Sequence, residues 1–299
     1  MMWVYDFLED VIKNPKKYNV HPDSVPELRK ILRALLRLSL GRTKSKQDDG
    51  KDFRNKSLEP DQHIYRARND KAQKKEDSKF NLMRHTYNGV GYWCPYDLLG
   101  LFLASMGPAP FGATKRSFYL PLTAVYGRWC SAIAGPPRGV GEHPCIFQCT
   151  WARRINQQDR FFLGASLGGY NFNPEQTGTW EKEMKMGRFN LVKKNLMIDW
   201  GFETSPSREQ NGLVGTRFGN CGETYPFIAI KKNISLQDTC YGLALSVSYI
   251  NKPEYDDKQR GDIWKNLWNP CPNCTHLVTV LAWNFANFQK DLGKAGAPR

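Results

Sequence analysis

The sequence predicts an α/β fold, in which a mixed sheet is flanked by helices and a helical segment is added at the N-terminus. Two runs rich in β-branched and aromatic residues, 145–153 and 160–166, predict a hairpin, because the polar stretch 156–159 separates them. A third run, 240–250, alternates its apolar residues as a strand does. The segment after Cys271 instead has apolar residues at helical spacing. Strands that alternate with helices indicate an α/β domain.

The first expected helix spans 26–40 and is amphipathic, with its basic residues toward the face opposite its apolar ones. Gly41 ends it. Its apolar side contains Leu28, Ile31, Leu32, Leu35 and Leu36, together with Ser39. We expect this side to dock onto the main domain. The alternative is a surface for a partner or for phosphate groups.

Residues 41–80 are dense in charges of both signs and poor in apolar residues, which is typical of a weakly ordered linker. The chain therefore divides into an N-terminal helical segment at 1–40, a charged flexible linker at 41–80 and a main domain at 81–299. We expect the core of that domain to span about 144–299, where the predicted strands and helices alternate.

Two short motifs far apart in the chain contain the residues of a metal site. Cys221 is followed two residues later by Glu223, and Cys271 is followed three residues later by Cys274. If Cys271 opens a helix, Cys274 lies about one turn later on the same side, so both sulfurs can bind one ion. A helix N-terminus also favours the thiolate that a metal requires. Three cysteines leave the fourth position of a tetrahedral zinc open, as in catalytic sites.

Other interpretations of these cysteines remain open. Cysteine is among the most buried residue types, so all three can be core residues. The pair Cys271 and Cys274 can also be a redox pair, although no βαβ pattern precedes it. A closed structural zinc would need a fourth ligand such as His276. On a helix, however, His276 lies about 200° around the axis from Cys274.

The two motifs together resemble the signature of the cytidine deaminase-like zinc superfamily, Cys-x-Glu followed by Pro-Cys-x-x-Cys. The first motif, with cysteine at the first ligand position (Cys221), is similar to that of the deaminases of free nucleosides. The run Trp268-Asn269-Pro270-Cys271 instead resembles the Trp-Ser-Pro-Cys of polynucleotide cytosine deaminases, in which the tryptophan helps to line the base pocket. The resemblance covers the two motifs and the strand between them.

The resemblance implies a cytidine deaminase-like fold with Zn²⁺ bound by Cys221, Cys271 and Cys274. It also implies that Glu223 transfers protons between the attacking water and the base. Family members usually continue after the second motif helix into further strands of the sheet, whereas this chain ends at Arg299. Either upstream segments supply those strands or the sheet is smaller than usual.

The formal net charge of +14 favours a polyanionic substrate or partner such as nucleic acid. Basic and aromatic residues also alternate at 115–119, 151–154 and 185–189, a mixture that suits single-stranded nucleic acid. The alternative for each run alone is an ordinary element with a buried ring and a solvated charge.

The chain has no apolar run long enough to span a bilayer, so no membrane partner is expected. Residues 1–13 lack the features of a signal peptide, because acidic residues interrupt the apolar ones. All eight cysteines are therefore expected to be reduced thiols in an intracellular protein of the cytoplasm or nucleus.

The sequence thus predicts a zinc-dependent enzyme that converts cytosine to uracil in nucleic acid, preferably single-stranded. Trp268, Asn220 and Arg217 are the candidate substrate-binding residues, chosen for their closeness in sequence to the motifs. One alternative is a deaminase of free cytidine or a related nucleoside or base. Another is a catalytically inactive zinc-containing protein that binds nucleic acid.

Overall fold

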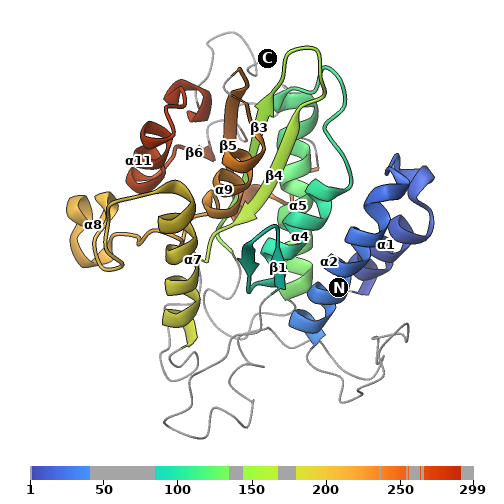
Figure 1. The fold of residues 1–299 in the computed structure, drawn as a ribbon, viewed down its shortest axis with the longest axis horizontal. Coiled ribbons are helices and arrows are strands. Elements are labelled where there is room, and N and C mark those ends of the chain that lie inside the picture. Colours follow the sequence, from blue (N-terminus) through green and yellow to red (C-terminus); the bar gives the residue numbers. More distant parts are fainter. Residues whose placement is uncertain are drawn as a thin grey trace, which may run out of the picture.

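The computed structural model of the chain describes residues 2–40, 85–134, 144–167, 180–235, 237–253, 255, 263 and 266–290. The linker predicted at 41–80 lies outside the described residues. Figure 1 shows the arrangement of the helices and strands.

The described parts of the chain contain eight α-helices and six strands. The helices are α1 (Met2–Lys13), α2 (Val25–Leu40), α4 (Pro95–Ser105), α5 (Leu120–Ala134), α7 (Trp180–Leu196), α8 (Pro206–Asn211), α9 (Thr224–Asn233) and α11 (Pro272–Val280). The strands are β1 (His85–Tyr87), β2 (Val90–Tyr92), β3 (Ile146–Arg153), β4 (Arg160–Ala165), β5 (Thr239–Ser246) and β6 (Leu267–Trp268). The predicted α/β class is confirmed at this level.

The main sheet has the strand order β4-β3-β5-β6. Phe147 in β3 lies opposite Ala165 in β4 and Leu245 in β5, so β4 and β5 end where β3 begins. The predicted hairpin is therefore confirmed. The prediction of a mixed sheet is wrong for the described strands, because every pairing among them is antiparallel.

The third strand is shorter than predicted. The run 240–250 is expected to be one strand, but β5 ends at Ser246 and a 3₁₀ turn, η6 (Val247–Tyr249), follows it. The side chain of Ser246 accepts a hydrogen bond from the backbone N–H of Ser248. Serine offers the backbone this local alternative to the sheet ladder, which accounts for the early end of the strand.

The two faces of the sheet are covered by different helices (Figure 1). On one face, Phe147 and Trp151 of β3 make ring contacts with Tyr126 of α5 and with Tyr119, which immediately precedes α5. Gln148 points to the opposite face, where its Cβ lies next to Gly222. Helix α9, which begins two residues after Gly222, packs against β3 and β4. The alternation of side chains along β3 thus separates the α5 layer from the α9 layer.

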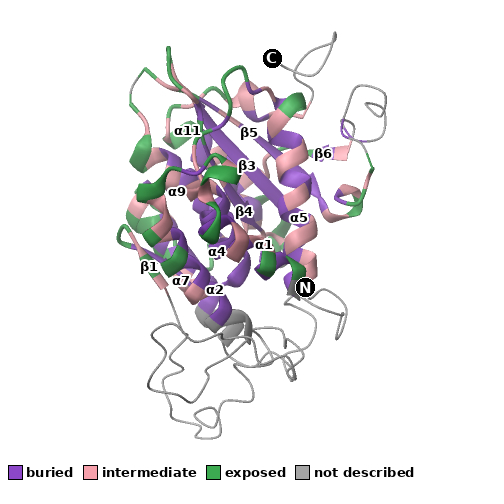
Figure 2. Cartoon of the chain, turned by 90° about the vertical axis from the view of Figure 1, so that its right-hand side faces the viewer, coloured by how far each residue is buried: buried purple, intermediate pink, exposed green. Residues whose placement is uncertain are grey.

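Helix α2 docks onto the main body, as its amphipathic pattern predicts. Its apolar residues are buried against the same hydrophobic core that includes α4 and α5 (Figure 2), and α2 packs directly on α4. The buried set is Leu28, Ile31, Leu32, Leu35 and Leu36. The hydrophobic core therefore includes α2 as well as the helices and strands of the main body.

Two further features bear on the sequence-based expectations. All eight cysteines lie in the described parts of the chain, and each is a free thiol. Among the described helices, none combines the length and the apolar content that crossing a bilayer requires.

Replacing Leu35 by Ala should lower the free energy of unfolding by about 2–5 kcal/mol, because it leaves a cavity between α2 and the core. Equilibrium denaturation in urea measures this change. Arg29→Ala on the exposed side of the same helix is the matched control, with an expected effect within about 0.5 kcal/mol. Equal effects of the two substitutions would contradict a docked α2.

Candidate metal centre

Three cysteines from the two sequence motifs converge in the folded chain. The sulfur atoms of Cys221, Cys271 and Cys274 all lie within 4.8 Å of one another. The Cys221 and Cys271 sulfurs are 3.4 Å apart, and those of Cys271 and Cys274 are 3.6 Å apart. Tetrahedral zinc with Zn–S bonds of about 2.3 Å places its sulfurs about 3.8 Å apart, so the group is compatible with zinc. The predicted convergence of the motifs is confirmed.

Helix α11 positions the second motif. Cys271 is its N-cap residue, Pro272 occupies the first turn, and the backbone N–H of Thr275 donates to the carbonyl oxygen of Cys271 at 2.8 Å. Cys274 follows within that first turn and is buried. The preceding strand β6 pairs Trp268 with Ala244, near the end of β5. The second motif therefore starts at the end of the sheet where β4 and β5 finish.

The first motif reaches this end of the sheet through a close backbone approach. A Cβ on Gly164 of β4 would lie 2.3 Å from the carbonyl oxygen of Gly222. A Cβ on Gly222 itself would lie 3.2 Å from the Cβ of Gln148. At Gly164 only glycine permits the loop to approach the strand this closely, because a Cβ there would displace the backbone of the loop. Cys221, next to Gly222, is held against the ends of β3 and β4 in consequence.

A buried arginine fixes the same loop from behind. Arg188 of α7 is only 1% exposed, and its guanidinium donates to the carbonyl oxygens of Gly219 at 2.5 Å and Cys221 at 3.0 Å. It also forms an ion pair of 2.9 Å with Asp97 of α4, which is equally buried. The Coulomb attraction of Asp97 opposes the desolvation of the arginine, and the pKa of Arg188 stays above its usual value.

Arg188 was not among the predicted site residues. In the sequence it lies within the run 185–189, which favours nucleic-acid contact. The structure corrects that interpretation, because Arg188 and Lys185 are buried. Lys115, in another of the three runs, is also buried, and its burial lowers its pKa to about 8. Neither Arg188 nor Lys115 offers its charge to a polyanion at the surface.

Glu223 lies two residues after Cys221, at the N-cap position of α9. Its side chain is 6% exposed. Burial, reinforced by the negative charge of Cys271, raises its pKa to about 7. A carboxyl group with such a pKa can both accept and release a proton near neutral pH.

The three thiols differ in their acidity. Contacts with the sulfur atoms of Cys221 and Cys274 hold the pKa of Cys271 well below the usual value of a thiol. The same interactions raise the pKa of Cys221 and Cys274 above the usual value. A cation bound by all three sulfurs would therefore displace protons from Cys221 and Cys274.

His276 makes its own contacts away from the cysteines. Its Nε2 atom accepts a hydrogen bond of 3.2 Å from Nε1 of Trp200, and its ring packs on Trp200 and Phe218. Among the described histidine, cysteine and acidic side chains, the close group at this site consists of the three cysteines. This arrangement disfavours a closed structural zinc with His276 as its fourth ligand.

The three predicted substrate contacts have different surroundings. Trp268 is 58% exposed, three residues before Cys271. The side-chain oxygen of Asn220 is buried and has no hydrogen-bond partner among the described residues. Arg217 forms an ion pair of 2.6 Å with Glu203 and lies over the ring of Phe202. The charge of Arg217 is therefore already paired, whereas the ring of Trp268 is exposed.

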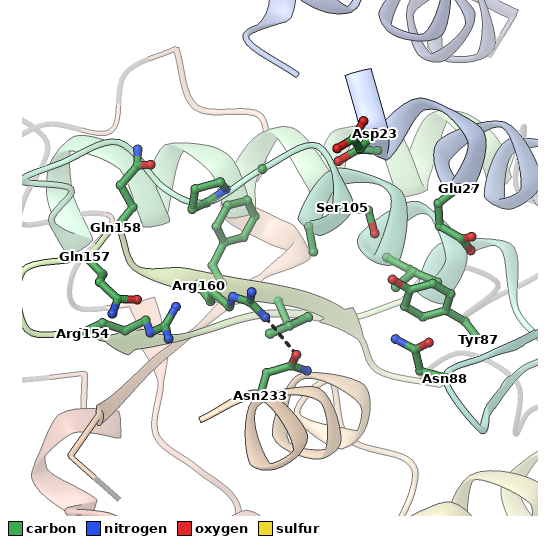
Figure 3. A pocket seen from close by; sticks show the side chains of 17 residues that line it. Asp23, Glu27, Tyr87, Asn88, Ser105, Arg154, Gln157, Gln158, Arg160 and Asn233 are labelled. Carbon is green, nitrogen blue, oxygen red and sulfur yellow. Dashed lines mark hydrogen bonds between the residues drawn. The ribbon is translucent and has the colours of Figure 1, made fainter. Parts of the chain in front are cut away.

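A separate cavity of about 550 Å³ lies at the other end of β4 (Figure 3). Asp23 and Glu27 line one side of it, and Arg154 and Arg160 line another, with Arg160 donating to Asn233. Residues of the two cysteine motifs do not line it. The cavity is thus distinct from the candidate metal centre.

Comparison of the chain with protein-family models, with curated proteins and with solved structures gave no match in any of the three.

Cys274→Ala should remove stoichiometric zinc, because the two remaining sulfurs do not complete the site. Metal analysis of the purified, dialysed protein measures this loss. Cys240→Ala is the control, since Cys240 is a buried free thiol outside the group and its replacement should leave the zinc content unchanged. Full zinc content in Cys274→Ala would contradict the assignment.

Proposed function

We propose that the chain is a zinc-dependent deaminase that hydrolyses cytosine to uracil in nucleic acid, with single strands preferred. The observation that supports this most is the convergence of three cysteine sulfurs with a buried glutamate two residues after the first of them. Three sulfurs leave one position of a tetrahedral ion open, which is the arrangement of catalytic zinc. The donor set of Cys221, Cys271 and Cys274 fits that ion.

Zinc held by these residues would supply Lewis-acid activation of water. Glu223 would then act as the general acid and base. Its carboxylate would accept a proton from the attacking water and pass it to the ring nitrogen, N3 of cytosine. The oxygen of that water would add to C4, and Glu223 would then move the second proton from the new hydroxyl group to the amino group at C4. The C4–N bond would break, ammonia would leave, and the C4 carbonyl of uracil would form. A pKa of about 7 for Glu223 suits both directions of transfer.

The polymeric substrate is supported by two features. Trp268 offers an exposed ring directly before the second motif, and a base removed from its stack can rest on such a ring. The net charge of +14 attracts polyanions from a distance.

An intracellular location, in the cytoplasm or nucleus, is consistent with the eight free thiols.

Free cytidine is the second candidate substrate. Cysteine at the first ligand position, Cys221, favours it, as in the nucleoside deaminases that this motif resembles. The burial of Lys115 and Arg188 favours it too, because it reduces the basic surface available to a polymer.

Glu223→Gln should retain zinc and lose at least about 10²-fold in turnover, because an amide of the same size cannot transfer the proton. Mass-spectrometric base analysis of a cytosine-containing single-stranded oligonucleotide, and separately of free cytidine, measures uracil formation. Cys240→Ala is the control and should keep its activity. Equal turnover by Glu223→Gln and the unchanged protein would refute the role of Glu223. Uracil from neither substrate with the zinc-loaded protein would refute cytosine deamination.

Oligonucleotide affinity should fall steeply as salt is raised, since cationic side chains that contact phosphates release bound counterions. Fluorescence anisotropy of a labelled oligonucleotide measures how the affinity depends on salt. The titration covers about 50 to 200 mM salt, where such affinities fall steeply. Free cytidine binding should be nearly independent of salt. A flat slope for the oligonucleotide would instead favour the nucleoside as substrate.

A further inference from the structure

Arg188 connects the loop of the first motif to the body of the protein, although it belongs to neither motif. Its Nε atom donates to the carbonyl oxygen of Gly219, and its Nη2 atom donates to that of Cys221. These two carbonyls lie two residues apart in the loop that leads to α9. A single planar group therefore fixes the path of the backbone on which the Cys221 thiol is mounted.

The remaining contacts of the guanidinium anchor that group on three other elements. Nη2 also donates to the carbonyl oxygen of Ala165, at the end of β4, at 3.1 Å. Nη1 donates to Asp97 of α4 at 2.9 Å. The guanidinium also lies over the ring of Tyr225, in the first turn of α9, with 5.1 Å between its carbon and the ring centroid. The fork of donors is rigid, so these contacts fix its position and orientation together.

We propose that Arg188 is the positioning residue of the metal centre. It holds the Cys221 sulfur close enough to the Cys271 and Cys274 sulfurs for all three to bind one ion, and thereby sets the affinity of the site for its metal. This role rests on metal binding by the three cysteines and is independent of the reaction that follows. Groups that orient metal ligands from outside the coordination shell typically change metal affinity about 10- to 100-fold when they are replaced.

The test is the affinity of the full chain for Co²⁺, followed by its thiolate absorption bands, and then for Zn²⁺ by competition. Arg188→Lys keeps the positive charge but lacks the planar fork that reaches both loop carbonyls. It should weaken metal binding about 10- to 100-fold and alter the Co²⁺ spectrum. Val192→Ala, one turn further along α7 in the buried core, is the control for general destabilisation. It should lower thermal stability and leave the affinity and the spectrum unchanged.

A second variant, Gly219→Ala, disturbs the contact between Arg188 and the loop from the loop side. Gly219 has φ +88°, and a Cβ there would lie 2.6 Å from the backbone nitrogen of Phe189. Gly219→Ala should displace the loop from Arg188 and weaken metal binding in the same way, even if Arg188→Lys does not fold. Unchanged Co²⁺ affinity in the folded variants, or an equal loss in Val192→Ala, would overturn the role of Arg188. Absence of Co²⁺ binding by the unchanged protein would instead refute the metal centre itself.

Discussion

The buried ion pair between Arg188 and Asp97 is the constraint on which the candidate site depends. Neither charge is exposed, so each would be costly to bury without the other. The pairing also places the guanidinium where its other donors meet the backbone carbonyls of β4 and of the Cys221 loop. One interaction thus joins α4, α7, β4 and the first cysteine motif.

Backbone proximity is the second constraint. Gly164 and Gly222 bring the strand and the loop into direct contact, so the cysteine loop rests on the end of the sheet. The second motif reaches the same end because β6 pairs with β5 immediately before Cys271. The site therefore has two parts. One is the Cys221 loop, which Arg188 and the glycine contacts fix, and the other is the N-terminus of α11, which follows the edge strand β6.

Some parts of this arrangement were predictable because local patterns specify them. Apolar spacing identified α2 and its docked face, and a polar break between two β-rich runs identified the β3–β4 hairpin. The spacing of Cys271 and Cys274 predicted a shared helix start. Others were not predictable from local patterns. The pairings of β5 with β3 and with β6 join strands that are far apart in sequence, so no local pattern specifies them. The early end of β5 at Ser246 depends on a side-chain hydrogen bond that the alternating apolar pattern did not reveal.

The sequence by itself determined which residues have the chemistry for a metal site: three cysteines, and a glutamate at a fixed spacing from the first. Ligand type and short-range spacing are properties of the chain, so they can be read without a fold. Only the tertiary structure decided that Cys221 meets Cys271 and Cys274, and that Arg188 faces inward. A basic residue beside an aromatic one looks the same whether it faces solvent or Asp97, because its burial depends on the elements that pack around it.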